Sequence, residues 1–169
     1  MPDSSVLFQR TQSGVSANVQ RAVELACRYL DRRERTESDV RDHLDAKGID
    51  ASAVDIVVDM LTDQGYLDDE RYARLFAEDK RHLEEWGNDR IRWALRDRGL
   101  DLALVSRVLA EEPASAELAR ALALLRRRFP GPLRDHRERE RALAVLLRKG
   151  YDSELALDAV AAHMADALP

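Results

Sequence analysis

The chain has 169 residues, of which 45% are hydrophobic and 35% charged, and a net charge of −5, so it can build one ordinary domain or an array of smaller units. Its 7 glycines, 5 prolines and single cysteine exclude collagen-like, low-complexity and disulfide-stapled proteins. The acidic balance argues against an autonomous nucleic-acid binder, no apolar run suits a membrane span, and the first residues lack a signal-peptide pattern, so a cytoplasmic protein is expected.

The chain begins with a polar stretch, residues 1–17, which has little periodicity and is predicted to be a disordered tail. Residues 18–66 form the first predicted unit. Apolar residues recur at helical spacing over residues 18–33, which predicts its first helix. Thr36 and Asp39 then match the pattern of a capping box at the start of a second helix.

A turn of one sequence pattern recurs every 51 residues, with its glycine at Gly48, Gly99 and Gly150. Each turn has a Leu, then three positions later Lys or Arg, followed by Gly, an apolar residue and Asp. The basic residue suits a helix C-terminus, Gly can adopt a positive φ, and Asp can cap the next helix. The three turns therefore predict helix-turn-helix corners, each joining two amphipathic helices.

The second predicted unit, residues 67–113, begins in a motif whose positions all have structural explanations. A helix can end at Gly65, Leu67 can make an apolar contact, and Asp68 can cap the following helix. Acidic residues at Asp68 and Asp69 suit a helix N-terminus, and Tyr72 is expected on a buried face of that helix.

The third predicted unit, residues 114–169, opens with a helix over residues 115–129 that Pro130 to Pro132 would stop. Each unit is thus expected to hold three helices, and no stretch alternates like a strand. The predicted fold is all-α: three tandem three-helix repeats in an elongated, curved array. A unit of about fifty residues buries little surface alone, so neighbouring units should share interfaces.

Candidate partner-binding residues are an exposed aromatic and a cluster of arginines. Trp93 lies off the apolar stripe of its helix and could either anchor a partner or fill space between helices. The arginines that could contact phosphates or an acidic partner are Arg126, Arg127, Arg128, Arg134, Arg137 and Arg141. The alternative is a solvated helix face, because Arg134 with Glu138 and Asp135 with Arg139 are spaced as (i, i+4) pairs.

Signals for enzyme chemistry are weak, so no catalytic residue, metal site or cofactor is predicted. The glycines are too far apart for a phosphate-binding loop. The histidines, His163 among them, have no partner at metal-ligand spacing and are interpreted as surface or boundary residues. Cys27 is interpreted as a small core residue.

Several motifs together resemble the RecX family of recombinase regulators. The likeness rests on the stretch from Gly65 to Ala73, on Trp86-Gly87-Asn88, and on the Lys47-Gly48 and Lys149-Gly150 turns, and it covers roughly residues 18 to 165. Asp39 and Val40 stand where the family usually has Glu and Leu, which are mild departures.

The resemblance implies a protein that binds the RecA recombinase filament on single-stranded DNA. Such proteins typically inhibit its ATPase, strand-exchange and coprotease activities, and so act in homologous recombination, DNA repair and the SOS response; stimulation is the alternative. No catalytic residue or cofactor comes with the family. Contact with single-stranded DNA is expected to be indirect or weak, and a monomer is expected. The rival hypothesis is direct DNA binding by the corners, used as helix-turn-helix motifs.

Overall fold

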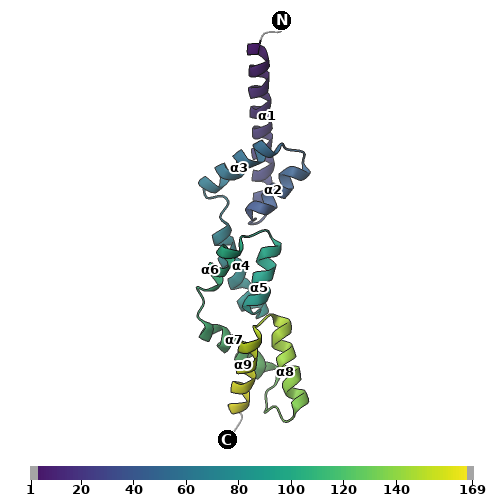
Figure 1. Cartoon of the computed structure of the whole chain (residues 1–169), viewed down its shortest axis with the longest axis vertical. Coiled ribbons are helices and arrows are strands. Elements are labelled where there is room, and N and C mark those ends of the chain that lie inside the picture. The colour runs from purple at the N-terminus through teal and green to yellow at the C-terminus, as the bar shows by residue number, and fades with distance from the viewer. Residues whose placement is uncertain (1–3, 167–169) are drawn as a thin grey trace. The chain divides into compact units, whose positions relative to one another are not determined.

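The computed structural model describes the backbone of residues 4–166 and the side chains of residues 17–166. Within that part of the chain the structure is helical and contains no strand (Figure 1). The helices are α1 (Ser4–Leu30), α2 (Glu37–Ala46), α3 (Ala51–Asp63), α4 (Asp69–Glu84), α5 (Asn88–Asp97), α6 (Leu102–Leu109), α7 (Ala114–Arg128), α8 (His136–Lys149) and α9 (Ser153–Ala165).

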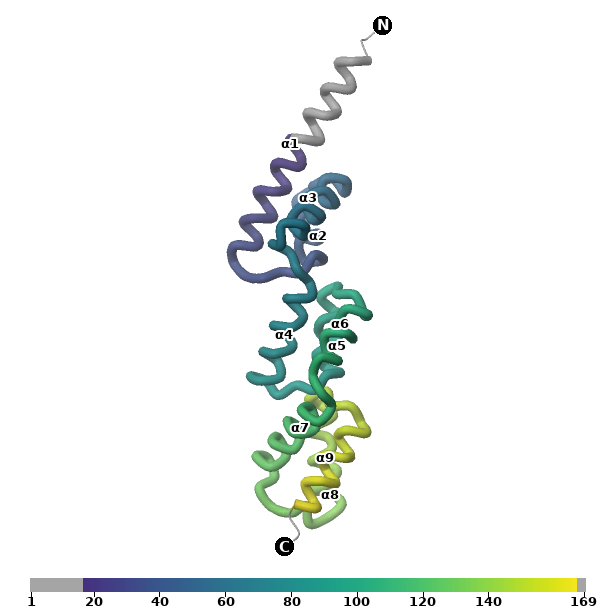
Figure 2. The backbone as a smooth tube through the Cα atoms, turned by 90° about the vertical axis from the view of Figure 1, so that its left-hand side faces the viewer, coloured from purple at the N-terminus to yellow at the C-terminus, as the bar shows by residue number. Residues whose placement is uncertain are grey.

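The helices form three tandem groups of three, which confirms the predicted fold class. Figure 2 follows them in order, α1 to α3, α4 to α6 and α7 to α9. The unit bounds 18–66, 67–113 and 114–169 remain predictions. The backbone of α1 begins at Ser4 and so extends through most of the predicted tail, residues 1–17, whereas the sequence placed the start of the first helix at residue 18; the side chains before residue 17 lie outside the described part of the chain.

The chain divides into two compact units. The first comprises the residues up to Tyr72 together with Arg98–Leu100. In it α1 packs against α2 and α3. Helical spacing brings one apolar stripe of each helix into the core, whose buried members are Ala22, Ala26, Val40, Leu44, Ile49, Ala53, Val54, Val57, Val58, Leu61 and Leu67.

The second compact unit comprises Ala73–Asp97 and the residues from Asp101 onward, so it holds most of the second repeat together with the third. In it α5 packs against α6, and α9 packs against both α7 and α8. Ile91, Leu95 and Val105 are fully buried in the second repeat. The third repeat buries Leu124, Leu125, Leu146 and Tyr151.

Local capping explains where several helices begin and end. Thr36 and Asp39 form the predicted capping box at α2. Gly65 ends the segment after α3 at φ +74°, and Asp68 accepts a hydrogen bond from the Arg71 backbone N at 2.8 Å at the start of α4. Leu67 is buried as expected, while Tyr72 is only partly buried. None of the described helices is both long and apolar enough to span a membrane.

Candidate functional site

The three corners share one backbone geometry. Gly48, Gly99 and Gly150 have φ of +72°, +80° and +83°, the left-handed region that a helix C-terminus favours. The residue after the glycine then bonds back to the helix. Ile49 N donates to Leu44 O, and Tyr151 N donates to Leu146 O, each at 3.2 Å. The recurring sequence pattern therefore encodes a recurring turn.

The aspartates after the corners do not all cap as predicted. Asp101 and Asp152 each accept hydrogen bonds from two backbone N–H groups in the first turn of the next helix. Asp50 makes no such cap. Its carboxylate accepts a hydrogen bond from the side-chain amide of Asn18 on α1 instead, so the prediction for Asp50 was wrong. The Asp50 carboxylate therefore links α1 to the start of α3 instead of capping α3.

The second corner packs against the first repeat. Thr36 Oγ1 donates a hydrogen bond to Arg98 O at 3.1 Å. A Cβ added to Gly99 would collide with the side chain of Ser38 in the first turn of α2. The corner therefore needs glycine both for its φ and for its close approach to α2.

The third corner packs against the second repeat in the corresponding way, one repeat later. Gly87 N donates to Lys149 O at 2.9 Å, and Asp89 N donates to Gly150 O at 3.0 Å. Lys149 Nζ reaches Glu84 O at 2.6 Å. Here too the corner meets the first residues of the preceding repeat's middle helix, α5.

An acidic side chain from the first turn of the following repeat completes each junction. Asp69 on α4 accepts a hydrogen bond from Glu37 N, the first residue of α2, at 2.9 Å. Glu117 on α7 accepts from Asn88 N, the first residue of α5, at 2.8 Å, and from Asn88 Nδ2 at 2.7 Å. Burial raises the pKa of both carboxyl groups above the usual range, and the backbone hydrogen bonds partly offset that rise. Each junction thus satisfies a helix N-terminus with an acid, which is half-buried at Asp69 and buried at Glu117.

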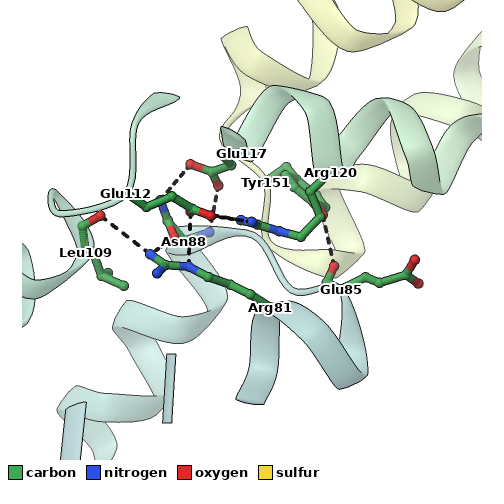
Figure 3. A network of polar contacts seen from close by, with 8 residues as sticks. All are labelled: Arg81, Glu85, Asn88, Leu109, Glu112, Glu117, Arg120 and Tyr151. Atoms are coloured by element: carbon green, nitrogen blue, oxygen red, sulfur yellow. Dashed lines mark hydrogen bonds and ion pairs between the residues drawn. The ribbon is translucent and has the colours of Figure 1, made fainter. Parts of the chain in front are cut away.

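A network of charged side chains surrounds the second of these junctions (Figure 3). Glu112 bridges two arginines, with its Oε2 3.0 Å from Arg81 Nε and its Oε1 2.5 Å from Arg120 Nη1. Tyr151 donates its hydroxyl to Glu85 O at 3.1 Å, and burial raises the pKa of Tyr151 to about 12. The tyrosine therefore stays a neutral donor at physiological pH, and the network joins the second repeat to the third.

The two tryptophans have different environments. Trp93 is 72% exposed on the outer side of α5. Trp86 is half-buried, with the Arg90 guanidinium 4.1 Å from its ring centroid and Phe76 packed edge-on at 6.5 Å. Of the two readings of Trp93, the space-filling one is therefore wrong, and its role as an anchor remains a prediction.

The consecutive arginines at the end of α7, which belong to the predicted arginine cluster, are mostly paired with acids. Arg126 pairs with Asp166, and Arg127 pairs with Glu85. Arg128 is exposed. Two of the three consecutive arginines are therefore already neutralised by acids of the same chain.

The arginines at the start of α8 are exposed, but the predicted side-chain pairs are replaced by capping contacts. Glu138 accepts from the Arg134 backbone N at 2.7 Å, and Arg139 Nε donates to Asp135 O at 3.4 Å. Asp135 caps α8 through Glu138 N. Arg137 and Arg141 lie on the solvent side of the helix.

Two further interpretations are corrected by the structure. Cys27 is exposed, because it lies one position, or about 100° of helix rotation, beyond the buried Ala26. His163 is only 5% exposed, because it follows Ala156 and Ala159 on the buried stripe of α9. No cluster of three potential metal ligands occurs among the described residues.

A hollow in the second compact unit lies beside α4 and is lined mainly by charged side chains. It measures about 320 Å³ and is lined by Arg74, Arg81, Glu111 and Glu112 among others. Arg74 Nη2 is 2.7 Å from Glu111 Oε1, and Arg81 pairs with Glu112. These opposite charges neutralise one another, so the hollow is lined by ion pairs instead of free charged groups.

Sequence reasoning missed the junction residues, above all Glu117 and the Arg81–Glu112–Arg120 network. One signal was present, since Asp69 and Glu117 are both acids in the first turn of a repeat's first helix. The sequence does not show that each acid faces the preceding repeat instead of its own helix.

Comparison with known proteins places these features in context. The family profile "RecX, first three-helix domain" matches residues 22–61, and "RecX, second three-helix domain" matches residues 68–109. A "Regulatory protein RecX" from Mycobacterium sp. (strain KMS) is 32% identical over 144 residues, covering 82% of this chain and 79% of the relative. One from Trichlorobacter lovleyi is 35% identical over 134 residues, covering 77% and 87%.

Solved structures agree with the fold. The crystal structure of RecX from Lactobacillus salivarius superposes with a TM-score of 0.79 at 19% identity, covering 89% of this chain and 98% of that one. A second crystal structure, of a regulatory protein RecX, gives a TM-score of 0.75 at 22% identity, covering 87% and 75%.

Proposed function

The chain belongs to the RecX family of regulatory proteins, and we propose that it binds the RecA recombinase filament on single-stranded DNA and inhibits its ATPase, strand-exchange and coprotease activities. In this role it acts as a monomer in the cytoplasm and takes part in homologous recombination, DNA repair and the SOS response.

The observation that carries this proposal is the repeated junction. At each junction the start of one repeat's middle helix contacts two parts of the next repeat, its glycine corner and an acid in the first turn of its first helix. The corner and the acid are those of Gly99 and Asp69 at the first junction, and those of Gly150 and Glu117 at the second. Tandem units of one design suit a partner that is itself a polymer of identical subunits, because each unit can contact a different subunit. Several modest contacts then combine, with gains of roughly 10²–10⁴ over a single contact. Holding neighbouring subunits together would restrain the motions that ATP turnover requires.

The surface available for this contact includes Trp93, Arg134, Arg137 and Arg141, all exposed. Exposed tryptophans and arginines are the residue types that dominate interface energies. Arg126 and Arg127 are weaker candidates, because binding through them would first require breaking their pairs with Asp166 and Glu85.

The test is ATP hydrolysis by the cognate recombinase on single-stranded DNA, titrated with the purified full chain. We expect saturable inhibition. Trp93→Ala should raise the concentration for half-maximal inhibition by about 30-fold, as for a hot-spot residue worth ~2 kcal/mol. Tyr66→Ala removes an aromatic that is 64% exposed and serves as the matched control. Unchanged hydrolysis at a molar excess of the wild-type chain would refute the proposal.

The rival hypothesis, DNA binding through the corners, has less support. Gly99 and Gly150 are packed against Ser38 and Arg90, so these two corners present little free backbone to a groove. The helix after the remaining corner, α3, carries Asp55, Asp59 and Asp63, which would repel phosphates.

A further inference from the structure

The first corner, residues 45–50, is an unoccupied copy of a contact that the molecule makes twice. At Gly99 and Gly150 the corresponding corner packs against the start of a middle helix, where an added Cβ would lie 2.3 Å and 2.2 Å from a side-chain atom of that helix. Gly48 has a similar φ of +72°, yet nothing described lies within 4 Å of its added Cβ. The first corner therefore has the backbone conformation of the docked corners without their occupant.

The docked corners show what an occupant supplies. Arg98 O accepts a hydrogen bond from Thr36 Oγ1 at 3.1 Å. Lys149 O accepts one from Gly87 N at 2.9 Å. Both donors belong to the residues just before a middle helix, α2 or α5, and the first N–H groups of a helix have no partner within the helix itself. The occupant of a corner is therefore the N-terminus of a helix.

The corresponding groups of the first corner are open. Among the described backbone N–H groups, none donates to Lys47 O or Gly48 O. The Arg21 side chain reaches Lys47 O only at 3.5 Å, which is long for a hydrogen bond. Lys47 is exposed, whereas Lys149 is half-buried and donates its amine to Glu84 O at 2.6 Å. The first corner thus offers carbonyl acceptors and an amine donor that its third counterpart uses in a contact.

The charges around the first corner also suit a helix N-terminus. The exposed acids Asp42, Asp45 and Asp50 outnumber the bases Lys47 and Arg21 there. A helix N-terminus carries about half a positive charge and is favoured beside acids. The same acids would repel a phosphate backbone. A protein helix is therefore a better occupant than a nucleic acid.

The middle helices of a second copy of this chain offer no free start. The starts of α2 and α5 already contact the second and third corners. The start of α8 is covered by its own residues, because Glu138 N donates to Asp135 and Arg134 N donates to Glu138. The helix that fits the first corner therefore belongs to a different protein.

We propose that the first corner is a docking site for the N-terminus of a helix on a partner protein. Lys47 O and Gly48 O accept hydrogen bonds from the residues that begin this helix, and the Lys47 amine donates to a carbonyl just before it. The partner residue that meets the corner is small, as Gly87 is, whose added Cβ would lie 2.3 Å from Gly150 O. The partner is a subunit of the recombinase filament, an assignment that rests on the proposed function and gives it a specific contact.

Gly48→Asn tests the docking site with little strain in the turn. Asn adopts a left-handed φ more readily than most residues, and the space around this position is open. The added side chain fills the space that the partner helix needs. The full chain, labelled at its single and exposed cysteine, Cys27, is titrated with recombinase filament on single-stranded DNA, and fluorescence anisotropy reports binding. Gly48→Asn should weaken binding by about 10-fold or more, as for an overpacked contact.

Gly65→Asn is the matched control. Gly65 has a φ of +74° and also has nothing within 4 Å of its added Cβ, but it follows α3 and belongs to no corner. Its filament affinity should equal that of the wild type, and urea denaturation should give both Asn variants similar midpoints.

A second pair of variants leaves both glycines in place. Lys47→Ala should weaken binding by about 10-fold, because it removes a charge-assisted hydrogen bond. Arg33→Ala removes one exposed positive charge from the turn after α1 and should bind like the wild type.

The outcomes separate the docking site from the proposed function. Wild-type affinity in Gly48→Asn and Lys47→Ala, or an equal loss in Gly65→Asn, would overturn the docking site and leave inhibition by the wild type intact. Self-association of the wild type in sedimentation velocity that Gly48→Asn abolishes would assign the first corner to a second copy and overturn it too. A wild-type chain that does not bind the filament would refute the proposed function and the docking site with it.

Discussion

Glu117 offers the most direct test of how the second and third repeats are joined. The side chain is 8% exposed and accepts hydrogen bonds from Asn88 N at 2.8 Å and Asn88 Nδ2 at 2.7 Å. Glu117→Ala removes both bonds and leaves the first N–H of α5 without its acceptor. Hydrogen bonds to a charged group contribute roughly 1.5–3 kcal/mol each. The cost of burying the carboxylate offsets part of this, so the free energy of unfolding should fall by about 2–3 kcal/mol.

The isosteric variant separates hydrogen bonding from charge. Glu117→Gln keeps one acceptor oxygen and removes the buried charge, so it should lower the free energy of unfolding by less than about 1 kcal/mol at neutral pH. Urea denaturation followed by circular dichroism measures both changes, and hydrogen exchange at the Asn88 amide reports the junction locally. An alanine variant within about 0.5 kcal/mol of the wild type would refute the assignment of Glu117 as the acid that holds this junction.

The pH dependence of the free energy of unfolding tests the burial of Glu117 independently. Burial raises the pKa of Glu117 in the folded chain, so ionisation is harder in the folded state than in the unfolded state. The stabilising contribution is therefore fully present below the unfolded-state pKa and is lost as pH rises through the folded-state pKa. The stability of the wild type relative to Glu117→Gln should decline over that interval. A difference that stays constant from about pH 3 to 7 would contradict the raised pKa.

Three further predictions address the same architecture. Gly150→Ala should lower the free energy of unfolding by about 2–4 kcal/mol, because φ is +83° there and the added Cβ would lie 2.6 Å from Arg90 N. Gly48→Ala should lower it by only about 1–2 kcal/mol, because φ is +72° but nothing lies within 4 Å of the added Cβ. Equal losses for the two variants in urea titrations would contradict the packing of the third corner. Asp69→Ala removes the acceptor of Glu37 N and should destabilise the first compact unit by about 1–2 kcal/mol, with faster hydrogen exchange at the Glu37 amide; unchanged exchange would count against the cap. In an alkaline titration followed by tyrosinate absorbance, an ionisation near pH 12 should belong to Tyr151 and should be absent in Tyr151→Phe; a phase near pH 12 that persists in this variant would disprove the assignment.

Local features of the fold could be predicted from sequence because their causes lie within a few residues. The glycine corners and the capping box at Thr36 and Asp39 depend on backbone conformation and on side chains three positions away. Trp93 lies off the stripe of Ile91 and Leu95, which are fully buried, but this position left open whether its side chain would be exposed or would fill space between helices.

Non-local partners could not be predicted in the same way. Asp50 had a donor on another helix, Arg127 had an acid 42 positions away, and Glu117 faces α5 instead of its own helix. Helical periodicity tells which side of a helix is apolar. It does not tell which neighbour brings a donor, an acid or a glycine to the polar side.

The open first corner has a consequence for how such chains can change in length. Nothing lies within 4 Å of the position that a Cβ on Gly48 would occupy, whereas Gly99 and Gly150 each meet the preceding repeat. A tandem duplication of 51 codons would supply a corner, a middle helix and a first-turn acid together. One genetic event would therefore provide both contacting surfaces of a new junction between repeats. Evolution could therefore lengthen or shorten the protein by whole modules without inventing a new interface.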